Sequence, residues 1–124
     1  MKTDTVIGII GGSGVYDMKG LENTNWTRVE SPFGEPSDDY LVGEFEGLKI
    51  VFLPRHGRGH VVSPSQVNYR ANIDGMKRLG VTDLVSVSAV GSLREDLVPG
   101  MFVVVDQFID RTFAREKSFF GEGL

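Results

Sequence analysis

Three apolar runs in this chain read as β-strands, and each one ends in a loop that suits a phosphate group. The runs are residues 6–10, 50–53 and 84–87, and their loops are residues 11–14, 54–60 and 88–92. Because parallel strands of an open α/β sheet bring their carboxyl ends to one edge, where ligands bind, we expect the loops to lie close together. Their main-chain N–H groups, hydroxyls and guanidinium would then surround one dianion.

The order of the remaining elements predicts an α/β fold. Residues 40–45 and 49–53 read as two strands joined into a hairpin through residues 46–48, after a turn-rich loop at residues 31–37. Buried strands on both sides of a helix indicate a mixed central sheet flanked by helices.

The clearest helix follows the second of the three loops. Ser63 can cap it, Pro64 suits its first position, and Gln66 completes a capping box with Ser63. Gly80 is placed to end the helix in a left-handed conformation. Apolar side chains repeat at helical spacing along one face, at Tyr69, Ile73, Met76 and Leu79.

Residues 84–87 predict another buried strand, and residues 101–105 predict a further one, because this second run is apolar on both faces. A strand of this kind needs neighbours on both sides, yet no pattern of a closing helix or strand follows residue 105. We therefore expect residues 1–124 to be the N-terminal portion of a single, longer domain.

Composition narrows the classes of partner. The net charge of −4 argues against nucleic acid or an anionic membrane, and no window approaches the length of a membrane span. The apolar run near the N-terminus is too short for a signal peptide, and the chain has no cysteine, which excludes disulfides and thiolate chemistry. These features fit a cytoplasmic protein.

The first loop, Gly11-Gly12-Ser13-Gly14, offers N–H donors and one hydroxyl to an anion. It lacks the third glycine of a dinucleotide-binding fingerprint, the lysine of a P-loop and the second glycine of a nucleophile elbow. A tight turn between a strand and the next element explains the loop equally well from its residues alone.

The second loop carries Arg55 and His56 directly after a buried strand. A guanidinium binds phosphate oxygens in a bidentate manner, while the simpler interpretation is a surface arginine beside a packed histidine. Glycines at positions 57 and 59 favour a loop shaped for a ligand. His56 and His60 have a metal-like spacing, but with two histidines and no cysteine in the chain we expect no metal.

The third loop begins with Ser88 and Ala89, whose small side chains would let a ligand approach the main chain. Close packing of strand and loop is the simpler explanation for this loop taken alone. Carboxylates at a catalytic spacing are missing, so no residue of this chain is assigned a catalytic acid or base.

As a set, the motifs of this chain resemble the trimeric purine nucleoside phosphorylase family, and among its members those that cleave methylthioadenosine. The resemblance covers nearly the whole chain and depends on the segments in this order. They are residues 8–14 (GIIGGSG), 31–37 (SPFGEPS), 55–60 (RHGRGH), 64–72 (PSQVNYRAN), 91–95 (GSLRE) and 106–112 (DQFIDRT).

The resemblance implies phosphorolysis of S-methyl-5′-thioadenosine to adenine and 5-methylthioribose 1-phosphate, a step of methionine and purine salvage. It implies no metal or organic cofactor, since inorganic phosphate is a co-substrate, and a homotrimer for the full-length chain. Chains of the family are about twice as long as this one. The segment that binds and protonates the base would lie beyond residue 124, which implies that residues 1–124 alone are inactive.

Residue by residue, the resemblance implies that Ser13, Arg55, His56, Ser88 and Ala89 bind phosphate, and that Ala89 also contacts the sugar of the substrate. Position 13 is often threonine in the family, and serine keeps the hydroxyl. Three alternatives stay open. The first is a phosphorylase for purine nucleosides or methylthioinosine, the second a fragment that binds phosphate or nucleoside without turnover, and the third a nucleosidase that uses water.

Overall fold

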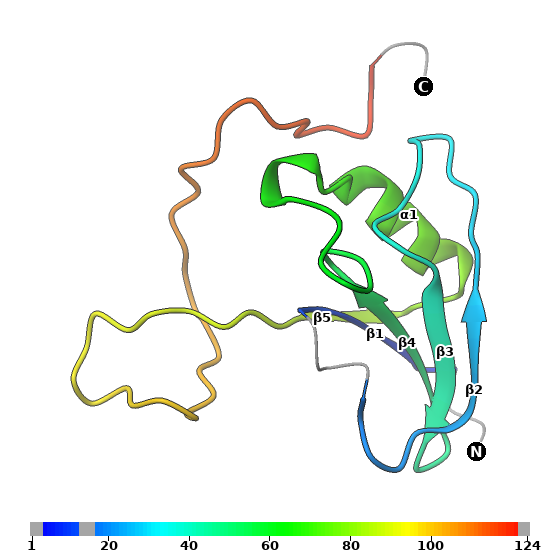
Figure 1. Ribbon diagram of the computed structural model, residues 1–124, viewed down its shortest axis with the longest axis horizontal. Coiled ribbons are helices and arrows are strands. Elements are labelled where there is room, and N and C mark those ends of the chain that lie inside the picture. The colour runs from blue at the N-terminus through cyan, green and yellow to red at the C-terminus, as the bar shows by residue number, and fades with distance from the viewer. Residues whose placement is uncertain (1–3, 13–16, 122–124) are drawn as a thin grey trace.

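One mixed sheet forms the centre of the fold (Figure 1). The computed structural model describes residues 4–12 and 17–121. Within them, five strands hydrogen-bond in the order β2-β3-β4-β1-β5. In chain order the strands are β1 (Val6–Gly11), β2 (Glu22–Thr27), β3 (Tyr40–Phe45), β4 (Leu48–Pro54) and β5 (Asp83–Ser86). The predicted α/β class with a mixed sheet is confirmed.

The sheet has an antiparallel part and a parallel part. Strand β3 pairs antiparallel with β2 and with β4, whereas β1 lies parallel to β4 on one side and to β5 on the other. The predicted hairpin joins β3 to β4 through Glu46 and Gly47, whose φ angles of 47° and 80° match a two-residue turn of the kind that suits twisted strands.

The predicted helix is present but begins later than its sequence indicates. The capping box of Ser63 and Gln66 closes a 3-10 turn, η1 (Pro64–Gln66), after which the backbone is extended at Val67. Helix α1 (Tyr69–Arg78) then starts behind Asn68, whose side-chain oxygen accepts a hydrogen bond from the N–H of Ala71 at 3.1 Å. The α-helix begins after Asn68 and not after Ser63, because the extended residue Val67 interrupts the helical turn between them.

The predicted end of the helix is confirmed. Gly80 has a φ of 83°, and its N–H donates to the carbonyl of Lys77 at 3.0 Å. This left-handed conformation suits glycine and leads the chain directly into β5.

The core lies between helix α1 and the sheet face beneath it (Figure 1). Its buried members are Ile10, Tyr40, Val51, Leu53 and Met76. The Tyr40 hydroxyl donates to the carbonyl of Asn72 at 3.0 Å, and the ring approaches α1 where Gly75 has no side chain. Burial, together with the negative charge of Asp74, raises the pKa of Tyr40, so its hydroxyl stays protonated and remains a donor.

Two asparagines fasten the loop of residues 31–37 to helix α1. The buried Asn72 side chain accepts from the N–H of Ser37 at 2.8 Å and donates to its hydroxyl at 3.0 Å. Asn68 donates to the carbonyl of Phe33 at 2.8 Å. The polar residues of the 64–72 motif therefore fix the path of the 31–37 motif.

Two predictions about buried strands are wrong in this structure. Strand β5 is present, but its residues are exposed, because within the described residues it pairs only with β1. Residues 101–105 form no strand, and Phe102 and Val104 are 92% and 97% exposed. In the described chain no strand lies beside them, so their backbone has no partner for the hydrogen bonds of a sheet.

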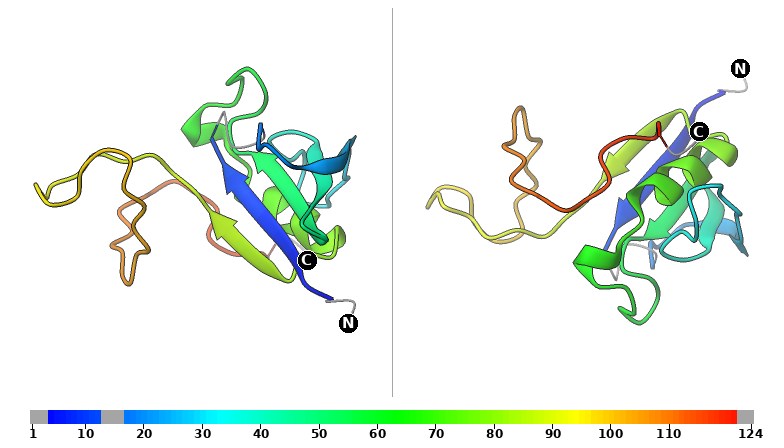
Figure 2. Two further views of the ribbon diagram at one scale, coloured as in Figure 1. Left: turned by 90° about the horizontal axis from the view of Figure 1, so that it is seen from below. Right: turned by 90° about the horizontal axis from the view of Figure 1, so that it is seen from above.

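The chain after β5 leads away from the sheet and then returns toward α1 (Figures 1 and 2). On its return, Arg115 donates to the Tyr69 hydroxyl at 2.7 Å, and the ring of Phe119 meets that of Phe33 edge-on at 5.2 Å. Among the described residues, no helix is long and apolar enough to cross a membrane.

Candidate functional site

The parallel strands bring the expected loops to one edge of the sheet. Gly11 at the end of β1 is in register with Pro54 at the end of β4, and Ile10 is in register with Ser86 of β5. The ladder continues past the strands, since the N–H of Arg55 donates to the carbonyl of Gly11 at 2.8 Å. The start of the first loop and the whole of the second and third loops therefore leave from the same edge.

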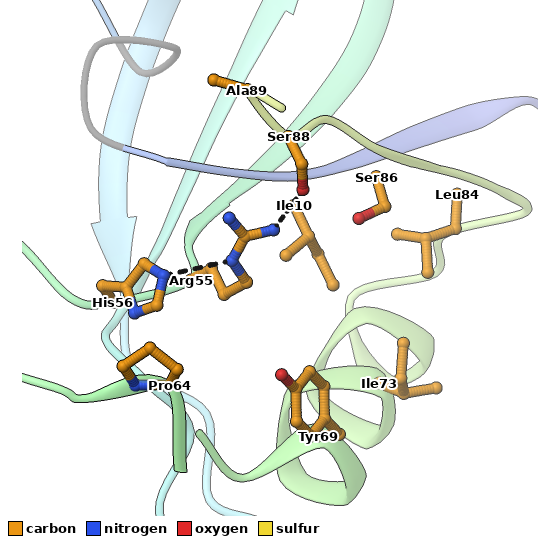
Figure 3. A pocket seen from close by; sticks show the side chains of 10 residues that line it. All are labelled: Ile10, Arg55, His56, Pro64, Tyr69, Ile73, Leu84, Ser86, Ser88 and Ala89. Carbon is orange, nitrogen blue, oxygen red and sulfur yellow. Dashed lines mark hydrogen bonds between the residues drawn. The ribbon is translucent and has the colours of Figure 1, made fainter. Parts of the chain in front are cut away.

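A cleft of about 460 Å³ opens at this edge (Figure 3). One side carries polar groups of the second and third loops, and the other side carries apolar groups of η1, α1 and β5. Its lining residues are Ile10, Arg55, His56, Pro64, Tyr69, Ile73, Leu84, Ser86, Ser88 and Ala89.

Arg55 joins the second loop to the third. Its Nη1 donates to the Ser88 hydroxyl at 2.6 Å, although the two residues are 33 positions apart. Its Nε donates to Nε2 of His56 at 3.3 Å (Figure 3). Arg55 as a residue is half-buried, and a charge that is partly shielded from water attracts an anion more strongly than a fully solvated one.

His56 is held from its other side by the main chain. Its Nδ1 lies 2.9 Å from the carbonyl oxygen of Val62, and its own carbonyl accepts from the N–H of Val62 at 2.9 Å. The ring of His60 stacks on that of His56, with centroids 5.4 Å apart and planes 17° from parallel. The second loop thus closes on itself around His56.

The loop also needs glycine at its first bend. Gly57 has a φ of 71°, and a Cβ there would lie 3.0 Å from the carbonyl oxygen of Ser37. The following residue, Arg58, donates its main-chain N–H to Asp38 at 2.6 Å and its Nη2 to the same carboxylate at 2.8 Å. Its guanidinium also lies 4.0 Å above the ring of Trp26.

These contacts perturb Asp38. Partial burial favours the protonated acid, but the hydrogen bonds from the Arg58 side chain and main chain outweigh it, so the pKa of Asp38 is lowered. The carboxylate is therefore an ionised anchor for the second loop near neutral pH.

The structure brings together four of the five residues predicted to bind phosphate. Arg55, His56, Ser88 and Ala89 all line the cleft. Ser13 and Gly14 lie outside the described residues, although β1 ends directly before them at this edge.

Tyr69 and Ile73 are placed differently from expectation. Their helical spacing with Met76 predicted a common buried face, and Met76 is buried in the core. Tyr69 and Ile73 are instead 40% and 36% exposed and line the apolar side of the cleft. Their position in the first turns of a helix that starts soon after the second loop was the available signal for this role.

The described residues contain no group of three or more histidine, aspartate or glutamate side chains placed to hold a metal ion. His56 and His60 stack as a pair and bring no carboxylate with them. What the arrangement offers chemically is a half-buried cation, a hydroxyl and exposed loop main chain on one side of a cleft with an apolar opposite side.

Comparisons with known proteins agree with one another. The sequence model of the Phosphorylase superfamily matches residues 6–123. The chain is 71% identical over 119 residues to an S-methyl-5′-thioadenosine phosphorylase of Rhodospirillum rubrum, covering 96% of this chain and 40% of that protein. It is 60% identical over 122 residues to the protein of that name from Geobacter sulfurreducens, covering 98% and 43%.

A solved structure shows the same fold. Methylthioadenosine phosphorylase from Schistosoma mansoni in its apo form superposes with a TM-score of 0.87 at 49% identity, over 94% of this chain and 42% of that one. The same enzyme in complex with tubercidin gives a TM-score of 0.86 at 48% identity, over 95% and 41%. The chain thus spans about two-fifths of the length of these relatives.

Proposed function

We propose that this chain, which belongs to the Phosphorylase superfamily, holds the phosphate co-substrate in the phosphorolysis of S-methyl-5′-thioadenosine. The observation that carries the proposal is the Arg55–Ser88 hydrogen bond of 2.6 Å, which joins two loops at the carboxyl edge of parallel strands. Ligands of open α/β sheets bind at this edge, and guanidinium is the side chain best suited to phosphate.

In the proposed reaction, an oxygen of inorganic phosphate attacks the anomeric carbon of the methylthioribose. The bond from that carbon to the adenine nitrogen breaks, and its electron pair leaves with the base, which takes up a proton. The products are adenine and 5-methylthioribose 1-phosphate. The sugar resembles an oxocarbenium ion at the transition state, as it does in glycoside hydrolysis.

The residues of this chain act by positioning and by charge. Arg55, the Ser88 hydroxyl and the main-chain N–H groups of His56 and Ala89 would hold the dianion beneath the sugar, and Ser13 would add a hydroxyl from the first loop. A dianion held rigidly there serves as nucleophile and as counter-charge to the ribosyl cation. The apolar side formed by Pro64, Tyr69, Ile73 and Leu84 would limit the access of water.

The proposal assigns this chain the phosphate side of the reaction. The relatives named methylthioadenosine phosphorylase are covered over 40–43% of their length, so recognition of the base is not assigned to any residue here. Three statements remain predictions from the sequence and the family resemblance. They are that the protein needs no cofactor, that the full-length chain forms a homotrimer, and that the protein is cytoplasmic.

Titration of inorganic phosphate into the 124-residue chain by calorimetry tests the proposal. We expect Arg55→Ala to weaken phosphate binding by about 10- to 100-fold, since a charge-assisted hydrogen bond is worth about 1.5–3 kcal/mol. Arg28→Ala is the matched control, because Arg28 is an exposed arginine that does not line the cleft. If both variants bound phosphate equally weakly, Arg55 would have no specific role in phosphate binding.

A second assay separates phosphorolysis from the alternatives. Adenine release from methylthioadenosine is measured with and without phosphate. The proteins compared are the chain, the full-length protein from Rhodospirillum rubrum, and that full-length protein with the equivalent arginine replaced. We expect no release from the chain alone, and in the full-length protein we expect release to require phosphate and to decline with loss of the arginine. Release that is unchanged when phosphate is removed would identify a hydrolase that uses water and would overturn the proposal.

A further inference from the structure

An unbroken row of hydrogen bonds runs along the polar side of the cleft, from the main chain just after the second loop to the third loop. It runs from the Val62 carbonyl to Nδ1 of His56, from Nε2 of His56 to Nε of Arg55, and from Nη1 of Arg55 to the Ser88 hydroxyl. The three distances are 2.9, 3.3 and 2.6 Å. Figure 3 shows the two bonds made by Arg55.

The partners on either side of the imidazole fix where its proton resides. A carbonyl oxygen only accepts, so Nδ1 of His56 must carry the proton that points to Val62. A guanidinium N–H only donates, so Nε2 must present its lone pair to Arg55. His56 is therefore the neutral Nδ1–H tautomer, and both of its ring nitrogens have partners within the protein.

This arrangement determines what Arg55 can offer to an anion. Two of its three nitrogens, Nε and Nη1, are held by His56 and Ser88. Among the described residues, no group accepts a hydrogen bond from Nη2. The fixed pair of bonds sets the plane of the guanidinium, and Nη2 with the second proton of Nη1 forms the end that remains available for a ligand.

We infer that His56 is a positioning residue whose neutral ring orients the guanidinium of Arg55 for phosphate and does not itself contact the anion. The inference rests on the proposed function, and it leaves the main-chain N–H of His56 free to contact phosphate. It refines the role that the family resemblance implies for this residue, since the ring acts through Arg55.

The second loop is built to hold the ring in this orientation. His56 and Val62 are joined by two hydrogen bonds, one through the main chain and one through the imidazole. Within the ring so formed, Gly57 and Gly59 have φ angles of 71° and 79°, and His60 stacks on His56. The imidazole therefore has little freedom to turn its Nε2 away from Arg55.

Two substitutions separate the two nitrogens of the ring. In His56→Gln the side-chain oxygen stands at the same number of bonds from Cα as Nε2, so it can still accept from Arg55. In His56→Asn the amide stands where Nδ1 was, so it can bond Val62 but leaves Arg55 without its acceptor. Both variants keep the main-chain N–H of residue 56, so a difference between them reports on the ring alone.

The first measurement needs no ligand, and its first part uses the unaltered chain. Long-range proton–nitrogen NMR correlations of the free chain report the tautomer of His56. We expect a protonated Nδ1 and an unprotonated Nε2, and a shift of the Arg55 Nε–H resonance in His56→Asn that is smaller in His56→Gln. A protonated Nε2, or an Arg55 resonance that is unaffected in both variants, would overturn the inference.

The second measurement is a double-mutant cycle on the affinity for inorganic phosphate. We expect His56→Asn to weaken binding about tenfold, His56→Gln to restore most of the loss, and His56→Asn to change nothing further in an Arg55→Ala background. The same loss in both backgrounds would show direct contact of the ring with the anion and refute the positioning role. Failure of the wild-type chain to bind phosphate would count against the proposed function, while the tautomer and the Arg55 resonance would still decide the role of His56.

Discussion

The contact between Tyr40 and helix α1 predicts a large cost for adding one methyl group at Gly75. A Cβ at this position would overlap the Tyr40 hydroxyl and lie 2.8 Å from Cε2 of the ring. Tyr40 is fully buried, and its hydroxyl is held by the carbonyls of Ala71 and Asn72, so the ring cannot move without losing hydrogen bonds.

The magnitude of the effect of Gly75→Ala follows from three contributions. Overpacking of a core position costs about 1–3 kcal/mol. Displacing the Tyr40 hydroxyl from its carbonyl partners costs about 1 kcal/mol more. The higher helix propensity of alanine offsets about 1 kcal/mol. We therefore expect Gly75→Ala to lower the free energy of unfolding by about 1–3 kcal/mol.

Urea denaturation followed by circular dichroism measures this difference, with Lys77→Ala as the control. Lys77 is an exposed residue of the same helix, so its replacement changes helix propensity without touching the core. We expect the control to differ little from the wild type, because lysine and alanine are both good helix formers. Unchanged or increased stability of Gly75→Ala would refute the placement of Tyr40 against the helix.

Two further perturbations test the anchoring of the loops. Asn72→Ala should lower the free energy of unfolding by about 1–3 kcal/mol and speed amide exchange at Ser37, because the N–H of Ser37 loses its buried acceptor; protection that persists would contradict this anchoring role. Although burial opposes them, hydrogen bonds from Arg58 lower the pKa of Asp38 in the folded state below its ordinary value of 3.8, so its contribution to stability is present above that pH and is lost as the pH falls through the folded pKa. Asp38→Asn should therefore be less stable than the wild type at pH 6, and this difference in stability should shrink toward pH 3 when urea midpoints are compared. A difference that does not depend on pH would exclude the ion pair with Arg58 as its cause.

The sequence predicted correctly those elements that are determined by a few neighbouring residues. The buried strand at residues 6–10, the hairpin about Glu46 and Gly47, and the helix end at Gly80 all depend on a few neighbouring residues, and all are present. Strand β2 (Glu22–Thr27) was missed because its sequence, ENTNWT, is polar and exposed. Its pairing with β3 and the stacking of Arg58 on Trp26 hold it in place, and neither is visible in the segment itself.

Other elements depend on partners that the pattern does not name. Residues 101–105 have the composition of a buried strand, but a strand forms only where another backbone offers hydrogen bonds, and the described chain offers none there. The start of α1 depended on a choice between two capping residues, Ser63 and Asn68. The extended conformation of Val67, which decided it, has no clear sequence signature.

The sequence predicted which loops lie together at the candidate site, but not all of the contacts within it. Strand order and strand direction bring Arg55 to Ser88, and the sequence indicated both residues and the shared edge of the sheet. The carbonyl of Val62 was not predictable, because a main-chain acceptor carries no side-chain signal. The family resemblance implied phosphate binding by His56 without naming the atom, and only the structure shows that both ring nitrogens face protein groups, Val62 and Arg55.

If the loops after β1, β4 and β5 gather around a single anion, a crystal structure of the chain soaked in phosphate or tungstate will show that anion between them. We expect one ion in the cleft, within about 3 Å of Arg55 Nη2 and of the Ser88 hydroxyl. An ion bound elsewhere, with Arg55 and Ser88 joined only to each other and the cleft empty of anion density at saturating concentration, would contradict it.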